Sequence, residues 1–154
     1  MFKHLFSRSF SSFPFHLAIP VHDITLARTF YGTILGLSTG RSAPTWQDYN
    51  FGGNQFVIHQ VSPEYRHIDM YNPVDGDDVP VTHFGIALPL LDFHLLSDRL
   101  KKHNISFIIH PHVRFEGHPG EQWTMFFKDP SNNNLEFKAM VHEDNLFTKD
   151  HINE

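Results

Sequence analysis

Two stretches of the chain alternate hydrophobic and polar positions in the same order. FHLAIPV, residues 15–21, and THFGIAL, residues 82–88, each place a histidine second and a small residue two positions later. Side chains two apart on a strand point to the same face, so Phe84, Ile86 and Leu88 share one apolar face of the second stretch. The pattern predicts two related strands, each with a histidine on the face turned away from the core.

A helical pattern follows each of these strands. After the first, Asp23 is the expected N-cap, apolar residues recur at helical spacing, and Gly36 is the expected stop. After the second, Asp92 is the expected cap, and Lys101 and Lys102 suit the C-terminal turn. Strand-like sequence follows each helix, and the two histidines lie 67 residues apart. The chain therefore reads as a duplicated unit.

We predict an α+β fold of two βαβββ modules, at about residues 14–62 and 80–141. Residues 63–79 are polar and turn-rich, and we expect them to form a solvated connector, with a lid over a pocket as the alternative. The domain then spans residues 15–141, between an N-terminal extension at 1–14 and a C-terminal tail at 142–154.

The N-terminal extension is rich in Ser and Phe, carries Lys3 and Arg8, and precedes the first acidic residue, Asp23. This composition is similar to that of a weak organellar transit peptide. A dispensable extension or an arm on a neighbouring subunit is the alternative. We expect a cytoplasmic protein, or an organellar one if residues 1–14 act as a transit peptide.

Composition narrows the chemistry. The 154 residues carry a formal net charge of −5 and no basic stripe, which makes nucleic acid an unsuitable partner. No apolar run approaches the length needed to span a bilayer. The chain has no cysteine, so any metal must be held by nitrogen and oxygen ligands. Thirteen histidines supply metal-competent nitrogens.

Three side chains form a plausible ligand set for a divalent metal. His16 and His83 occupy matching positions of the repeat, and Glu136 lies on the non-core face of the closing strand NLEFKAM. His59 follows Val57 on one face of the strand FVIHQV and is the candidate fourth ligand. Two imidazoles and a carboxylate suit a borderline metal. The alternative is that these are core histidines hydrogen-bonded to their neighbours.

Four segments carry a resemblance to the vicinal oxygen chelate superfamily: FHLAIPVHD, ARTFYGTILGL, VTHFGIAL and MFFKDPSNNNLEF. This superfamily includes glyoxalase I, extradiol dioxygenases, fosfomycin-resistance enzymes and bleomycin-binding proteins. The resemblance spans residues 15 to about 140. It implies paired modules that form a curled mixed sheet around a metal cleft, often in a homodimer, with His16, His83 and Glu136 as ligands. His59 falls where four-ligand members commonly carry Glu.

The resemblance favours a metal-dependent enzyme that acts on a small oxygenated substrate chelated through vicinal oxygens, with glyoxalase-like lyase or isomerase chemistry. Gly85 and Ala87 would then leave the cleft open above His83. The metal, which is Fe, Zn, Ni or Mn, would act as a Lewis acid. His118 and Glu121 are the candidate proton carriers, with an exposed histidine and an ordinary loop acid as the alternative.

Two other functions stay open. The stretch from His118 to Glu136 is similar to the extradiol dioxygenase signature, which favours ring opening at Fe(II). Phe126 replaces the Tyr of that signature, and Asn132 replaces a Gly or Pro. Non-catalytic binding of a small molecule, as in bleomycin-binding relatives, is the third possibility.

Substrate contacts are expected from side chains near the second module. Arg114 offers a planar fork for an anionic group, with a structural arginine as the alternative. Trp123 is expected to wall the cleft, with a core role as the alternative. Phe126 is expected beside the substrate.

Overall fold

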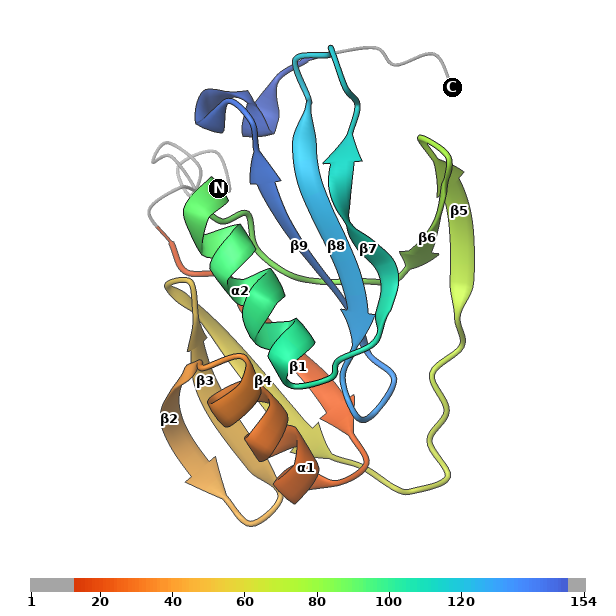
Figure 1. Cartoon of the computed structure of the whole chain (residues 1–154). Helices are drawn as coiled ribbons and strands as arrows, with labels where there is room; N and C mark the ends of the chain where they lie inside the picture. The colour runs from red at the N-terminus through yellow and green to blue at the C-terminus, as the bar shows by residue number, and fades with distance from the viewer. Residues whose placement is uncertain (1–12, 150–154) are drawn as a thin grey trace, which may run out of the picture.

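The computed structural model describes residues 13–149, which form two β-sheets, a separate hairpin and two main helical segments (Figure 1). The first sheet has the strand order β1-β4-β3-β2, and the second has the order β7-β8-β9. The first sheet contains β1 (His16–Val21), β2 (Ser38–Ala43), β3 (Trp46–Phe51) and β4 (Asn54–Gln60). The second contains β7 (Phe107–Arg114), β8 (Gln122–Lys128) and β9 (Asn134–Met140).

The first module follows its predicted order. Asp23 caps α1 (Ile24–Arg28), since its carboxylate accepts hydrogen bonds from the backbone N–H groups of Thr25 and Leu26. The helix continues as a π-helical segment, η2 (Thr29–Ile34), and Gly36 follows with φ of +77°. The cap and the stop predicted from the sequence are both confirmed.

The second module repeats this order with one irregular element. Residues 82–88 form no continuous strand, but they run beside β9 through two parallel bridges, Phe84 to Leu135 and Ala87 to Lys138. The order of this segment, β9, β8 and β7 therefore matches β1, β4, β3 and β2, which confirms the predicted duplication. The segment leads into α2 (Leu90–Lys102).

Gly85 explains the close approach of this segment to β9. A Cβ built on Gly85 would lie 1.5 Å from the carbonyl oxygen of Glu136, so any side chain would collide with backbone. We expected Gly85 to leave a substrate cleft open. Gly85 does line a hollow beside His83, but backbone packing alone already requires glycine at this position.

One other helix detail differs from the prediction. The N-cap of α2 is Pro89, which makes no side-chain capping hydrogen bond, and Asp92 lies in the first turn. Asp92 still suits that position because the helix dipole favours negative charge there. Lys101 and Lys102 occupy the last turn as predicted.

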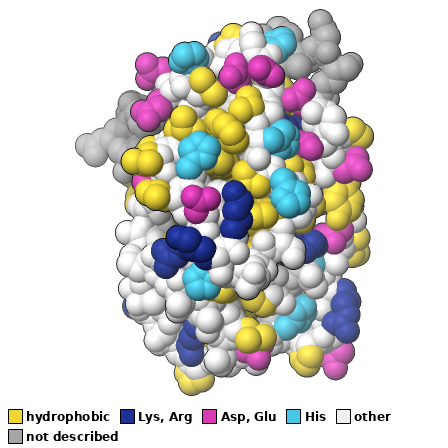
Figure 2. Space-filling view, in the orientation of Figure 1, with side chains coloured by type: hydrophobic (Ala, Val, Ile, Leu, Met, Phe, Trp, Pro, Cys, Tyr) yellow, Lys and Arg dark blue, Asp and Glu magenta, His cyan; other side chains and the backbone are white. Residues whose placement is uncertain are grey.

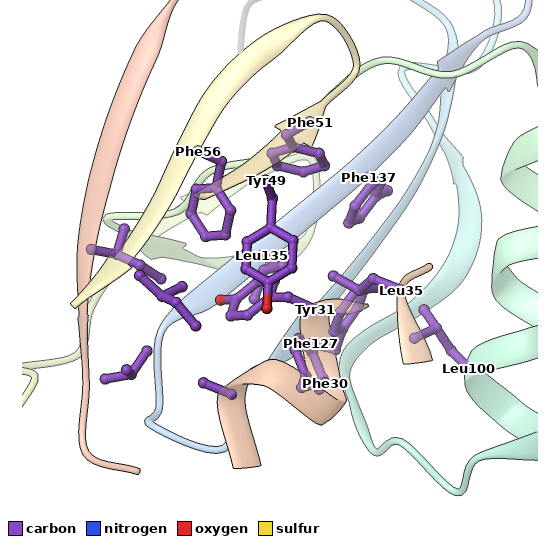
Figure 3. Close-up of a cluster of buried hydrophobic side chains, with 14 of the residues drawn as sticks. Phe30, Tyr31, Leu35, Tyr49, Phe51, Phe56, Leu100, Phe127, Leu135 and Phe137 are labelled. Carbon is purple, nitrogen blue, oxygen red and sulfur yellow. The ribbon is translucent and has the colours of Figure 1, made fainter. Parts of the chain in front are cut away.

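Both modules contribute to one hydrophobic core (Figure 3). Phe51 and Phe56 of the first sheet face Phe137 of the second, and the rings of Phe51 and Phe137 are 5.7 Å apart. Each buried aromatic side chain contributes about 2 kcal/mol through the hydrophobic effect. The predicted core face of residues 82–88 packs against this cluster as well. The opposite, outer face of each sheet therefore points away from this shared core.

The connector between the modules contains a β-hairpin, β5 (Met70–Val74) and β6 (Asp77–Val81). Val79 packs with Ile109 and Phe126 in a small second cluster on the outer face of β7 and β8. We expected a solvated linker here, and the hairpin instead covers part of the sheet next to His83. The predicted tail contains a short 3-10 helix, η3 (Glu143–Phe147).

The molecule also carries apolar surface on the side of α2. Leu91 and Leu95 are exposed, and Figure 2 shows apolar side chains gathered on this face where α2 and η3 lie. Among residues 13–149, no helix is both long and apolar enough to cross a bilayer. Residues 1–12 of the predicted transit segment lie outside the part of the chain that the structure describes.

Candidate metal centre

His83 and Glu136 face each other on the outer side of the second sheet. Nε2 of His83 lies 3.2 Å from Oε2 of Glu136. The other ring nitrogen, Nδ1, lies 2.7 Å from the carbonyl oxygen of Pro80 and donates its hydrogen to it. This second contact directs Nε2 toward the carboxylate, the arrangement in which a neutral imidazole offers that lone pair to a metal.

Glu136 is buried and held by three side chains. Oε1 accepts a hydrogen bond of 2.8 Å from Oγ1 of Thr124, and Nζ of Lys138 lies 3.2 Å from Oε2. Burial raises the pKa of Glu136, but His83, Lys138 and Thr124 outweigh it and lower the pKa to about 2. The carboxyl group is therefore ionised across the neutral pH range.

The pair also changes His83. The hydrogen bond to Glu136 raises the pKa of His83 above its ordinary value, although partial burial acts in the opposite direction. A neutral imidazole next to a carboxylate leaves two acceptors facing each other. Either a proton or a cation must lie between them.

Two hollows adjoin His83. One, of ≈ 350 Å³, lies on the side of Glu136 and Lys138 and is walled by Leu146 and Phe147 of η3. The other, of ≈ 200 Å³, lies between β1 and residues 82–84 and includes Tyr65, His67 and Asn134. A larger hollow of ≈ 420 Å³ beside α2 has mainly apolar lining and none of the predicted site residues.

The chain does not bring His16 to this pair. His16 lies exposed on the outer face of β1, with Nδ1 2.9 Å from Oε1 of Gln55. Within residues 13–149, no three His, Cys, Asp or Glu side chains gather closely enough to hold a metal ion. One chain therefore supplies two of the three predicted ligands at one place.

His59 is displaced from the position equivalent to Glu136. Leu17 pairs with Phe56 in the first module, as Phe84 pairs with Leu135 in the second. The next residue on each closing strand is Val57 in the first module and Glu136 in the second. His59 thus corresponds to Lys138, and its ring packs 6.4 Å from Trp46. The structure places an apolar side chain where a first-module carboxylate ligand would lie.

The two candidate proton carriers lie at the far end of β8. His118 is exposed in the loop between β7 and β8, and Glu121 accepts a hydrogen bond from the backbone N–H of Gly117. Phe126 pairs with Glu136, and Gln122 lies four residues earlier on β8. At roughly 3.3 Å per residue, Gln122 is about 13 Å along the strand from the level of Glu136. Within one chain, His118 and Glu121 are not beside the pair.

Two of the candidate substrate contacts have other roles. The side chain of Arg114 is 4% exposed and donates to the carbonyl oxygen of Val74 at 2.7 Å, with Asp77 nearby. Trp123 lies on the core face, where its ring contacts Phe93 and His94 of α2. Neither is placed to touch a substrate at His83.

Phe126 supports the pair from below. Its fully buried ring meets the ring of His83 edge-on at 5.1 Å. It therefore fixes the imidazole and excludes water beneath it, and it exposes no surface of its own that a substrate could contact.

Sequence reasoning missed Lys138 and Thr124. Lys138 shares a strand face with Glu136, so the two-residue period could have revealed it. Thr124 became visible only through the pairing of β8 with β9, in which it lies opposite Lys138.

Comparisons with known proteins agree with this architecture. Residues 14–137 match the model of the glyoxalase/bleomycin resistance protein/dioxygenase superfamily. A crystal structure of a glyoxalase/bleomycin resistance protein/dioxygenase from Alicyclobacillus acidocaldarius is 35% identical, with a TM-score of 0.72, and the match covers 88% of this chain and 97% of that one. None of the curated proteins searched matches this chain.

Two solved structures with lower identity share the fold. The fosfomycin resistance protein FosX from Listeria monocytogenes is 16% identical, with a TM-score of 0.65 over 88% of this chain and 98% of that one. A lactoylglutathione lyase from Agrobacterium tumefaciens is 20% identical, with a TM-score of 0.57 over 83% and 93%.

Proposed function

Because the chain belongs to the glyoxalase/bleomycin resistance protein/dioxygenase superfamily, we propose that it is a divalent-metal-dependent enzyme. Its substrate is a small oxygenated molecule that chelates through two neighbouring oxygens, and its chemistry is of the glyoxalase-like lyase or isomerase type. The observation that carries the proposal is the contact between His83 and Glu136 at 3.2 Å. A bound Fe, Zn, Ni or Mn would supply Lewis-acid stabilisation of negative charge on the substrate oxygens.

The donor chemistry fits such a metal in part. His83 offers one imidazole nitrogen and Glu136 one carboxylate oxygen, which are nitrogen and oxygen ligands of the type a borderline divalent ion accepts. We infer that His16 of a second copy supplies the third ligand in a homodimer. His16 is exposed, its ring is held by Gln55, and the outer face of its sheet points away from the shared core.

The side chains around the pair prepare it for this role. Thr124 and Lys138 keep Glu136 ionised and oriented, and Pro80 fixes the ring orientation of His83. Phe126 keeps water from the underside of the imidazole. His118 and Glu121 stay candidate proton carriers from the sequence, and their positions in one chain do not support that role.

The alternative of ring-opening dioxygenation draws no support from Phe126. The ring is buried and has no hydroxyl group to bind or deprotonate a catechol. Metal uptake distinguishes the proposed enzyme from a protein that binds a small molecule without catalysis, because the second function needs no bound metal.

Titration with Mn²⁺, Zn²⁺, Ni²⁺ and Fe²⁺ tests the proposal, with thermal unfolding as the readout. At least one ion should raise the unfolding temperature of the wild type and have a much smaller effect on Glu136→Gln. The same shift in both proteins, or none in the wild type, contradicts the proposed metal centre.

Mixing two variants tests the shared site. His16→Ala and His83→Ala homodimers should each bind metal weakly, whereas a refolded mixture should recover one intact site in each heterodimer. A mixture that binds no more metal than its components contradicts the shared site.

A further inference from the structure

Lys138 places a positive charge beside the predicted metal ligands. It lies two residues after Glu136 on the same face of β9, and its Nζ is 3.2 Å from Oε2. About 30% of its side chain is exposed, and it lines the ≈ 350 Å³ hollow next to His83. The ammonium group therefore reaches both the carboxylate and the space where a ligand would lie.

The charge of Lys138 has no carboxylate of its own. Glu136 is its one partner in the described part of the chain, and that carboxylate is also a predicted metal ligand. Lys128, on the same sheet face, differs because both oxygens of Asp69 accept from its Nζ at 2.7 and 2.8 Å. Lys128 is neutralised in place, whereas Lys138 shares its counterion.

Metal binding would leave this hollow with excess positive charge. A divalent ion brings two positive charges, Lys138 brings one, and Glu136 offsets one of the three. Two positive charges then face the hollow. An anion with two adjacent oxygens would neutralise them, and charge-assisted hydrogen bonds from Lys138 would hold it in register.

The rest of the hollow limits the size and polarity of the ligand. Leu146 and Phe147 of η3 contribute exposed apolar side chains, and Gly85 and Ala87 contribute little volume. The hollow thus combines one cationic end with an apolar wall, as small-molecule sites commonly do.

We propose that Lys138 is the substrate-binding residue that selects a small anion, one with a carboxylate or similar oxyanion among its two chelating oxygens. This inference rests on the proposed metal-dependent function and names its substrate class. It predicts that metal affinity and anion affinity respond differently to the loss of Lys138. Removing a cation beside Glu136 leaves metal binding unchanged or tighter, whereas anion binding weakens.

The test uses Mn²⁺ and oxalate as probes on the full chain. Free Mn²⁺, measured by electron paramagnetic resonance, reports metal affinity, and calorimetry on the Mn²⁺-loaded protein reports oxalate affinity. Acetohydroxamic acid, a less highly charged chelator with adjacent oxygens, serves as the reference ligand. Lys138→Met should lose oxalate affinity by roughly tenfold or more, with a smaller loss for acetohydroxamic acid.

Two variants control the experiment. Lys138→Arg keeps the charge and should retain most of the oxalate affinity. Lys101→Met removes the same charge from exposed α2 and should change neither affinity.

The outcomes separate the inference from its premise. A wild type that binds no divalent metal removes the proposed function and this inference together. A wild type that binds Mn²⁺, with equal oxalate affinity in Lys138→Met, overturns the inference alone. Parallel loss of Mn²⁺ and oxalate in Lys138→Met would assign Lys138 a structural role and also overturn it.

Discussion

Tyr31 of the first module donates a buried hydrogen bond of 2.8 Å to the carboxylate of Asp129 in the second. Asp129 also accepts from the backbone N–H groups of Ser131 and Asn133 and from the side chain of Asn133. Asn133 in turn donates to the carbonyl oxygen of Pro20. The DPSNNN segment, one of the stretches that carried the family resemblance, thus joins the two modules through these hydrogen bonds.

Tyr31→Phe should lower the free energy of unfolding by about 2 kcal/mol, because it removes a hydrogen bond to a buried charged group. Chemical denaturation at pH 7 measures the change. Tyr49→Phe is the matched control, since the buried Tyr49 hydroxyl has no partner among the described residues. An equal loss of unfolding free energy in the two variants would show that the Tyr31 hydroxyl does not stabilise the contact between the modules.

The same tyrosine should make stability sensitive to alkaline pH. Burial, helped by Asp129, raises the pKa of Tyr31 well above 10. The unfolded chain therefore loses this proton near pH 10 while the folded protein keeps it, and stability falls as the pH rises above that value. Denaturation curves from pH 8 to 10.5 should show a shallower decline for Tyr31→Phe. Identical slopes for the wild type and the variant would contradict this account.

Gly85→Ala should prevent normal folding, at a cost above about 3 kcal/mol, because the new Cβ would collide with the Glu136 carbonyl oxygen. Soluble yield and thermal unfolding measure this effect. Gly120→Ala is the control, since a Cβ there meets nothing within 4 Å. A stable, normally folded Gly85→Ala protein would show that residues 82–88 are not held against β9 in this way.

Arg114→Ala should destabilise the protein by about 2–4 kcal/mol and leave the hairpin β5–β6 more open to proteolysis. The guanidinium is buried and holds Val74, so its loss leaves polar groups without partners. Arg41→Ala is the surface comparison. The Arg41 side chain is 76% exposed, and its pair with Asp48 should contribute less than about 1 kcal/mol. An Arg114→Ala protein as stable as Arg41→Ala would return Arg114 to the list of substrate contacts.

The sequence predicted the parts of this fold that depend on local periodicity. Alternation on a strand identified the core faces, and matching histidines identified the duplication. The burial of Arg114 and the side of β8 on which Trp123 lies depend on long-range packing, which no local period encodes. The hairpin at residues 70–81 was missed although the sequence carries its turn, because Asp75 and Gly76 form a two-residue connection with positive φ at both positions, for which Asp-Gly is a typical sequence.

In the candidate site too, some features were predictable from the sequence and others depend on long-range structure. His83 and Glu136 come together because the repeat places their strands side by side, and this was predictable. The equivalence of His59 with Lys138 depends on strand register, and a shift of two residues leaves the face unchanged while moving the side chain along the strand. The place of His16 depends on a second copy of the chain, so its contribution is an inference about assembly.

Elemental analysis of the purified protein, beside His83→Ala and Glu136→Ala, tests the metal centre most directly. Both variants must first show unfolding temperatures near that of the wild type without metal. The account predicts a near-stoichiometric divalent metal in the wild type and its loss from both variants. A wild type that carries no metal and takes up none from a panel of divalent ions would contradict it.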